Sequence, residues 1–564
     1  RVTWGKPIEF IFSLLGYMVG LGNLWRFSYL CFKNGGGAFL VPYLLSVAVF
    51  GLPMYIFEIA IGQFTQQGKL NAWDRIPIMK GYGYACIVMT MMSIVPYMLV
   101  MAWGVIYLYH SFTSNDLPWT VCDNQWNTQS CISYKQWLPG NNSTILNDSS
   151  LVQNYSDTYY VLRLPNEQDS IYGGFNWPML ICLVLSYLSI VAITIKGIKS
   201  SGKVSRYGDF IDSASLVWRL CARLFLSSNI AASHARYSLT PAEYKVRAVS
   251  LAACGCIAEF VITAACAITT SCGIVKLPNF NILCILFVTN PNPQVWIEAA
   301  SQVLYTYAIG FASLTTFSSY NNFNNNFYRQ ALILVPVGAF TSLLMGLMTF
   351  SYLGHMASVL GVNVDKILKS GPGLIFQVIP LGFSLLPLPQ LWSVLFFGMF
   401  YFVAVDSVFS DFDALVTSIL DIFPRFKGTG RRRVLANFAV AFVLFVASCT
   451  QLTSSGIYIF EFIFYYGASG IILLLLALCE SLSVGWLWDV NQFAIDLEKM
   501  TGDKLSLWFK LCYRYFIPAI TSVGDFVYPV WANLLGWILS LCSLLWIPGV
   551  FIYVLYKGRG SMKQ

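Results

Sequence analysis

Glycines, an amide and an arginine interrupt a long apolar stretch near the start of the chain. Gly16, Gly20 and Gly22 lie among Leu, Met and Val residues, and Asn23 and Arg26 follow them. Glycine weakens a helix, and unwound backbone there leaves carbonyl groups that can bind a cation and amide groups that can hold a carboxylate. The pattern therefore predicts a broken helix at an ion or substrate site. The alternative, close helix packing, explains the glycines but not Asn23 and Arg26.

A carboxylate stands in another apolar stretch, where Asp406 is followed by Ser407. A charged group is costly in such surroundings, so a bound cation is the expected partner. Oxygen ligands suit a small hard cation. The alternative is a structural carboxylate paired with another side chain.

The sequence offers little for enzyme chemistry. The histidines His110, His234 and His355 have no metal-ligand spacing to one another or to a cysteine pair. No nucleotide-binding loop occurs in the sequence either. We therefore expect neither an enzyme nor a pump driven by ATP.

The elements that must position these groups are membrane helices. Hydrophobic residues make up 57% of the chain and charged residues 11%, which is far from the composition of a soluble globular protein. Apolar runs of the roughly 20 residues that span a bilayer recur about twelve times. Their approximate centres are Gly20, Leu45, Val100, Leu185, Val261, Tyr307, Leu343, Phe402, Val443, Leu473, Ile517 and Trp546. Because spanning helices satisfy their own backbone hydrogen bonds, we expect an all-α bundle.

Basic residues set the expected orientation, because short cytoplasmic loops are enriched in Lys and Arg. Such residues follow the second expected span at Lys69, Arg75 and Lys80, and the eighth within 425–433. The net charge of +8 is then explained by orientation in the membrane, and no nucleic-acid partner is expected. We expect a multi-pass plasma-membrane protein in contact with lipid, with both termini in the cytoplasm.

The stretch at about 113–176 is expected to face outside. Its two cysteines, Cys122 and Cys131, lie where an oxidising compartment would allow a disulfide; the alternative is two free thiols. The same loop contains four Asn-x-Ser/Thr acceptors for glycosylation, at Asn141, Asn142, Asn147 and Asn154.

Several motifs extend these expectations. They are Arg1–Trp4, Gly20–Phe27, Asn34–Phe39, Gln302–Phe311, Ser319–Asn326 and Val405–Ser407. Together they resemble the neurotransmitter:sodium symporters over nearly the whole chain, apart from about residues 204–290. The resemblance implies two inverted five-helix repeats with broken first and sixth helices, plus two peripheral helices. The implied boundaries are 1–275, 290–488 and 489–564.

The resemblance also implies ion sites. One sodium site would take the carbonyls of Gly16, Val19 and Val403 and the side-chain oxygens of Asp406 and Ser407. A second sodium site would take the Met18 carbonyl, Asn23 and Thr306, and a chloride site would take Tyr43, Gln302, Thr306 and Ser342. Gly338 stands where the family supplies an asparagine to both of the latter sites. We therefore expect a sodium Hill coefficient nearer one than two, and a gain in sodium affinity from Gly338→Asn.

A small amino-acid-like substrate is implied by Gly20, since carriers of monoamines in this family have an aspartate there. Glycine leaves room for the substrate's own carboxylate, which the amides at Leu21 and Gly22 and the Tyr97 hydroxyl would hold. The remaining implied pocket residues are Tyr17, Ser93, Tyr307, Ala308 and Phe311. The Tyr-Ala-Ile-Gly sequence favours GABA and related ω-amino acids, with glycine or another small neutral amino acid left open.

The implied gates differ at the two sides of the membrane. An inner pair, Arg1 with Asp421, is present. The outer Arg26 lacks its usual acidic partner, because that position is Phe464 and the nearest carboxylate, Glu461, is one helical turn away. We therefore expect closure of the outer side to depend on Tyr97 and Phe311.

A basic segment at about 204–245 departs from the family pattern where the fifth span should begin. The apolar stretch 249–275 could serve as that span, which would make the basic segment a cytoplasmic insertion; an alternative exon or a faulty gene model would also explain it. Two functions remain open: a sodium-coupled symporter, and a member that has lost transport and acts as a binding or scaffold protein. A channel is disfavoured because nothing indicates a continuous pore.

Overall fold

A computed structural model describes residues 3–4, 7–113, 116–121, 175–195, 293–311, 313–360, 371–383, 388–423, 430–453, 456–467, 470–518 and 544–557. These residues form helices and turns, and none of them is in a strand. The inner-gate residue Arg1, the cysteines Cys122 and Cys131, the acceptors Asn141, Asn142, Asn147 and Asn154, and residues 204–290 lie outside this described part.

Two helices are interrupted near their centres, as the sequence predicts. The first span consists of α1 (Pro7–Met18), α2 (Leu21–Leu24) and α3 (Arg26–Lys33), and it bends by 47° at the break. The sixth span consists of α14 (Pro293–Thr306) and α15 (Ser313–Ser318), joined by an irregular turn. The predicted breaks in both helices are confirmed.

The remaining spans are mostly continuous. In chain order they are η1 (Gly36–Phe39) with α4 (Leu40–Ser46), η2 (Val47–Gly51) and α5 (Leu52–Thr65); α6 (Lys80–Ser111); α9 (Trp177–Thr194); α16 (Phe327–Leu360); α19 (Pro389–Ile422); α20 (Gly430–Cys449); α21 (Gly456–Gly467) with α22 (Ile471–Leu482) and η10 (Ser483–Leu487); α24 (Leu507–Leu511) with η11 (Cys512–Phe516); and α27 (Trp546–Lys557). Shorter connecting helices are η3 (Asn71–Arg75), η4 (Pro77–Met79), η5 (Pro118–Thr120), η7 (Leu374–Val378) with α18 (Ile379–Phe383), η9 (Thr450–Leu452) and α23 (Val490–Thr501). Among the described residues, seven helices are long and apolar enough to cross a membrane, and the bent first span makes an eighth.

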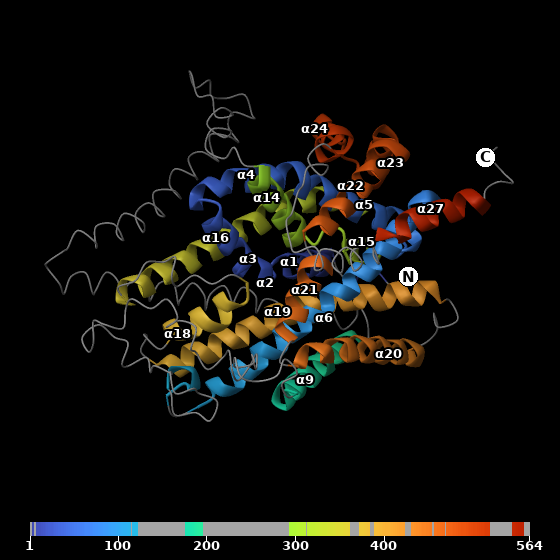
Figure 1. Ribbon diagram of the computed structural model, residues 1–564. Helices are drawn as coiled ribbons and strands as arrows, with labels where there is room; N and C mark the ends of the chain where they lie inside the picture. The colour runs from blue at the N-terminus through green and yellow to red at the C-terminus, as the bar shows by residue number, and fades with distance from the viewer. Residues whose placement is uncertain are drawn as a thin grey trace, which may run out of the picture.

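The helices pack as two groups, each with its own hydrophobic cluster. The first cluster draws on α1, α3, α4, α5, α14, α15, α16 and the helices after α21. The second draws on α6, α9, α18, α19 and α20, together with α2. Figure 1 shows α6 and α19 as two long helices side by side, with α9 and α20 packed next to them. The break in the first span falls between the groups, because Met18 belongs to the first cluster and Leu21 to the second.

Apolar side chains also cover the outer faces of this bundle. Ile181 on α9 and Phe442 on α20 are 63% and 67% exposed, and Ile333 on α16 is 66% exposed. Exposed apolar surface of this extent on long helices is typical of contact with lipid chains. The composition of the sequence therefore reflects membrane-facing surface as well as a packed core.

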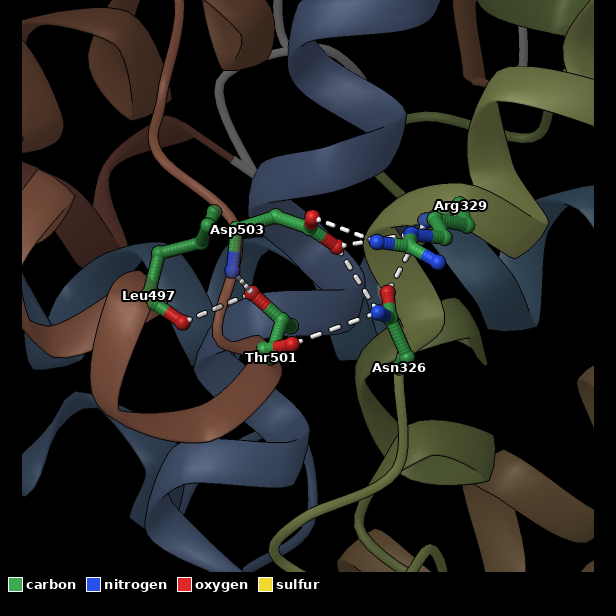
Figure 2. Close-up of polar contacts among 5 residues, drawn as sticks. All are labelled: Asn326, Arg329, Leu497, Thr501 and Asp503. Carbon is green, nitrogen blue, oxygen red and sulfur yellow. Dashed lines mark hydrogen bonds and ion pairs between the residues drawn. The ribbon is translucent and has the colours of Figure 1, made fainter.

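A polar cluster ties the start of α16 to the turn between α23 and α24 (Figure 2). Arg329 donates to both carboxylate oxygens of Asp503 at 3.0 Å. Asn326 donates to the same carboxylate at 2.7 Å and to the Thr501 carbonyl at 3.2 Å. These contacts connect the seventh span to the segment that precedes the eleventh.

Candidate functional site

The break in the first span exposes backbone groups at its centre. Gly20 adopts an extended conformation (φ −101°, ψ 175°) between the end of α1 and the start of α2. The Asn23 side chain closes the break by donating to the Met18 carbonyl at 2.9 Å. Little room is left for a side chain at residue 20, because a Cβ there would lie 3.2 Å from Ser407 Oγ and 4.0 Å from the Tyr97 hydroxyl.

The break in the sixth span has a strained geometry. Ala308 has a φ of 50° and Gly310 a φ of 87°, in the left-handed region that a residue with a side chain rarely adopts. A buried carboxylate from α5 holds this turn, because Glu58 accepts a hydrogen bond from the Gly310 amide at 2.7 Å. The cost of the strained turn is therefore offset in part by a buried hydrogen bond.

A cavity lies where the two breaks meet α6 and α19, with an empty volume of about 520 Å³ that includes open solvent. Its lining residues are Tyr17, Met18, Gly20, Leu21, Gly22, Asn23, Ser93, Ile94, Tyr97, Tyr305, Thr306, Ala308, Phe311, Ser407, Val408 and Asp411. The lining therefore brings the backbone of both breaks together with side chains of α6 and α19.

Eight of the nine residues expected in the substrate pocket line this cavity, and Tyr307 is the exception. The Tyr307 side chain is buried outside the cavity wall, and its hydroxyl donates to the Val335 carbonyl at 2.7 Å. The structure also adds lining residues that the sequence analysis missed, above all Asp411 and Tyr305. Asp411 follows Ser407 by four positions, a spacing that puts two residues on one helix face, and this signal was available in the sequence.

The predicted first sodium site centres on Asp406. This residue lies on α19, which packs against α1, and its Oδ2 atom is buried without a hydrogen-bond partner among the described residues. The neighbouring Ser407 donates to the Val403 carbonyl at 3.3 Å. A buried carboxylate oxygen with no donor fits a cation, so the residues present are compatible with sodium.

In the predicted second sodium site, two of the expected ligands lie together, but large side chains occupy the space near Gly338. Thr306 donates to the Asn23 side-chain oxygen at 3.0 Å, which brings two of the expected groups together. Gly338 faces this region, but a Cβ there would lie 3.0 Å from Tyr307 Cε1 and 3.2 Å from Met18 Sδ. The space of the missing asparagine is therefore occupied by two large side chains. Gly338→Asn would therefore require Tyr307 and Met18 to shift by a few tenths of an ångström in addition to supplying the missing ligand.

The predicted chloride site lies on the other side of Thr306. Gln302 donates to the Thr306 hydroxyl at 3.2 Å, and Ser342 donates to the Gly338 carbonyl at 3.1 Å. The Tyr43 hydroxyl is fully buried and makes no hydrogen bond of ordinary geometry with the described residues. A buried hydroxyl donor in this position is compatible with an anion.

On the expected outer side, an aromatic ring takes the place of a carboxylate partner. Arg26 stacks over the Tyr305 ring, with 4.9 Å from its guanidinium carbon to the ring centroid, and donates to Ser301 at 2.9 Å. Phe464 packs edge-on against the same ring at 6.0 Å. Tyr305 also covers Gly22, where any Cβ would lie 2.6 Å from its Cε1. Tyr305 therefore lies between Arg26 and the break in the first span. It is a third aromatic residue, beside Tyr97 and Phe311, that we expect to help close the outer side.

On the expected inner side, the N-terminal segment is packed onto the end of α15. The Trp4 indole donates to the Phe317 carbonyl and its backbone amide to the Tyr320 carbonyl, both at 3.1 Å. Asp421 is buried near the end of α19. These contacts attach the N-terminal segment to the end of the sixth span.

Interrupted helices around a central cavity, within an all-helical membrane bundle, are the arrangement typical of secondary transporters. A sequence model of the sodium:neurotransmitter symporter family matches residues 1–248 and 278–558, and this chain belongs to that family. The match continues through the basic segment at 204–245 and leaves residues 249–277 unmatched, so family-like sequence extends farther than the motifs alone indicated.

Curated relatives include transporters of two solutes. The chain is 34% identical to the sodium- and chloride-dependent GABA transporter 2 of Mus musculus, over all of this chain and 88% of that protein. It is 32% identical to the sodium- and chloride-dependent creatine transporter 1 of Bos taurus, over all of this chain and 85% of that protein. These relatives are transporters, in agreement with the expectation of a protein that is not an enzyme.

A solved structure shares the fold. The crystal structure of MhsT in complex with L-phenylalanine superposes with a TM-score of 0.63 at 18% identity, covering 96% of this chain and 100% of that one. The predicted fold class is thereby confirmed.

Proposed function

We propose that this protein is a sodium-coupled symporter of a small neutral amino acid or a GABA-like solute, assisted by chloride. The observation that carries the proposal is the buried, unpartnered Asp406 Oδ2 on α19, beside the cavity and opposite the break in the first span. The family membership and the named sodium and chloride dependence of the relatives support it.

In this proposal the residues divide into three groups. Gly16, Val19, Val403, Asp406 and Ser407 bind sodium, which supplies a positive charge beside the substrate. The substrate carboxylate lies at Gly20, Leu21 and Gly22 with Tyr97, and Ser93, Ala308 and Phe311 shape the remaining space. Tyr43, Gln302, Thr306 and Ser342 hold chloride.

Alternating access would come from movement of one helix group against the other. The cavity lies between the two hydrophobic clusters, so a tilt of either group opens it to one side. Tyr305 with Arg26 covers one entrance, and the Trp4 segment covers the other. The repeat boundaries at 1–275, 290–488 and 489–564, the plasma-membrane location and the cytoplasmic termini are part of the same proposal.

The test is uptake into cells that express the chain. Labelled GABA, glycine and creatine are offered in sodium, in choline replacing sodium, and in gluconate replacing chloride. We expect uptake of at least one solute that disappears without sodium and falls without chloride. Sodium-independent uptake would contradict the coupling.

A family member that binds without transporting is a second candidate, favoured by the filled space at Gly338. Melting temperatures of the purified protein, compared with uptake in cells, distinguish the two candidates. A ligand that binds the folded state raises the melting temperature whether or not it is transported. Stabilisation by sodium and substrate without any uptake, in protein present at the cell surface, would favour the second candidate.

A further inference from the structure

A carboxylate projects into the substrate cavity one turn beyond the proposed sodium site. Asp411 lines the cavity together with Ser407 and Val408 on the same helix, α19. Its Oδ1 atom accepts hydrogen bonds from the Tyr17 hydroxyl and from the Ser313 hydroxyl, the latter at 2.7 Å. These two donors come from the two interrupted spans, so the carboxylate is fixed at the point where both meet α19.

The other oxygen of this carboxylate remains available. Asp411 Oδ2 accepts no hydrogen bond from the described residues, and no Lys, Arg or His among them forms an ion pair with Asp411. The buried Lys69 interacts electrostatically with Asp411 without forming an ion pair. Its ammonium group donates to the Thr90 hydroxyl at 2.6 Å and to the Cys86 carbonyl at 3.2 Å. The described residues that line the cavity include no basic side chain.

An unpaired carboxylate in such a cavity is costly unless a cation meets it. The position of Asp411 relative to the proposed sodium site indicates which end of the substrate would carry that cation. Four residues along a helix correspond to about 6 Å between Ser407 and Asp411. Gly20 lies beside Ser407, so Asp411 stands about one helical turn from the proposed carboxylate end.

We propose that Asp411 binds a cationic nitrogen at the end of the substrate remote from its carboxylate, and thereby selects ω-amino or guanidino acids over α-amino acids with apolar tails. The inference rests on the proposed function and narrows its substrate class. In GABA the two charged groups lie about 5 Å apart when the chain is extended, which matches the spacing along α19. An α-amino acid of the same composition would instead place a methyl group against Asp411.

Two isomers separate these cases, because GABA and α-aminobutyrate have the same atoms. Purified protein in sodium is titrated with each isomer, and binding is read from the rise in melting temperature. A charge pair in a desolvated site commonly contributes enough for a preference of about 30-fold or more for GABA. Preference for α-aminobutyrate in the wild-type protein would overturn the inference without any variant.

Substitutions then test whether the preference for GABA over α-aminobutyrate depends on the Asp411 carboxylate. Asp411→Asn keeps the shape and removes the charge, and we expect it to abolish the preference for GABA while sodium alone still stabilises the protein. Ser313→Ala removes one hydrogen bond to Asp411 but leaves its charge, so the preference should persist. Glu461→Gln, an exposed carboxylate outside the cavity lining, is the control for loss of charge.

The outcomes distinguish this inference from the proposed function. Sodium-dependent uptake with an isomer preference that Asp411→Asn leaves unchanged overturns the inference and leaves symport standing. A change in sodium dependence without a change in isomer preference also overturns it, because Asp411 would then bind an inorganic cation. Absence of any sodium effect on stability or uptake overturns both.

Discussion

At the scale of single residues, Asp406 and Asp411 are two carboxylates of α19 with different surroundings. Asp406 has a buried oxygen without a donor, whereas Asp411 is held by two hydroxyl groups and faces the cavity. In the proposals above, the inorganic cation binds at Asp406 and the organic one at Asp411. Each assignment can be tested by removing one charge.

Asp406→Asn should remove sodium-coupled uptake. The substitution keeps the size of the side chain but removes the formal charge from a site where an uncompensated cation is costly. We expect uptake to fall to the level of untransfected cells, with surface expression measured in parallel. Glu461→Gln serves as the control, and normal sodium-dependent uptake by Asp406→Asn would show that sodium binds elsewhere.

Gly20→Asp should abolish uptake by repulsion. A side chain at residue 20 begins 3.2 Å from Ser407 Oγ, where the substrate carboxylate is proposed to lie. Two like charges about 4 Å apart repel by about 4 kcal/mol at the effective dielectric of a partly solvated site. Gly20→Asn has nearly the same size, so it should lose less uptake than Gly20→Asp. Equal losses in the two variants would mean that size alone is responsible.

At the scale of helices, the sequence predicted the breaks but not all of their surroundings. The glycines, Asn23 and Asp406 can be recognised in the sequence because their neighbours along the chain are mostly apolar. The position of Tyr305 could not be predicted from the sequence, because it depends on contacts with Gly22 and Arg26 in another span. The filled space at Gly338 likewise depends on a contact between two helices, which a single sequence does not reveal.

The turn in the sixth span provides a test at this scale. Glu58 on α5 accepts a hydrogen bond from the Gly310 amide, and leaving such a buried donor unsatisfied costs about 1–3 kcal/mol. Glu58→Ala should therefore lower the melting temperature of purified protein by several degrees and reduce uptake. Glu58→Gln retains an acceptor oxygen and should lose less of both. If the two variants behave alike, the hydrogen bond to Gly310 is not what stabilises the turn.

At the scale of the whole molecule, contacts between distant segments lie around the cavity. Tyr305 lies over Gly22 in the first span, and Trp4 is bound to the end of α15. These contacts connect the first span and the N-terminal segment to the sixth span. In the proposed function, how far the substrate accumulates depends on the number of sodium ions that cross with it.

The number of coupled sodium ions should be one, and a paired substitution should raise it. Each sodium ion contributes about 2.3 kcal/mol per 100 mV and about 1.4 kcal/mol per tenfold concentration ratio, so a second ion roughly doubles the driving force. Tyr307 and Met18 fill the space where an asparagine at 338 would supply a ligand. Gly338→Asn alone should therefore reduce surface expression, whereas Gly338→Asn with Tyr307→Leu provides both the oxygen and the room. We expect a sodium Hill coefficient near one for the wild-type protein and a higher value for the double variant, with Tyr307→Leu alone as the control. A wild-type coefficient near two that the double variant leaves unchanged would show that another group already completes the second site.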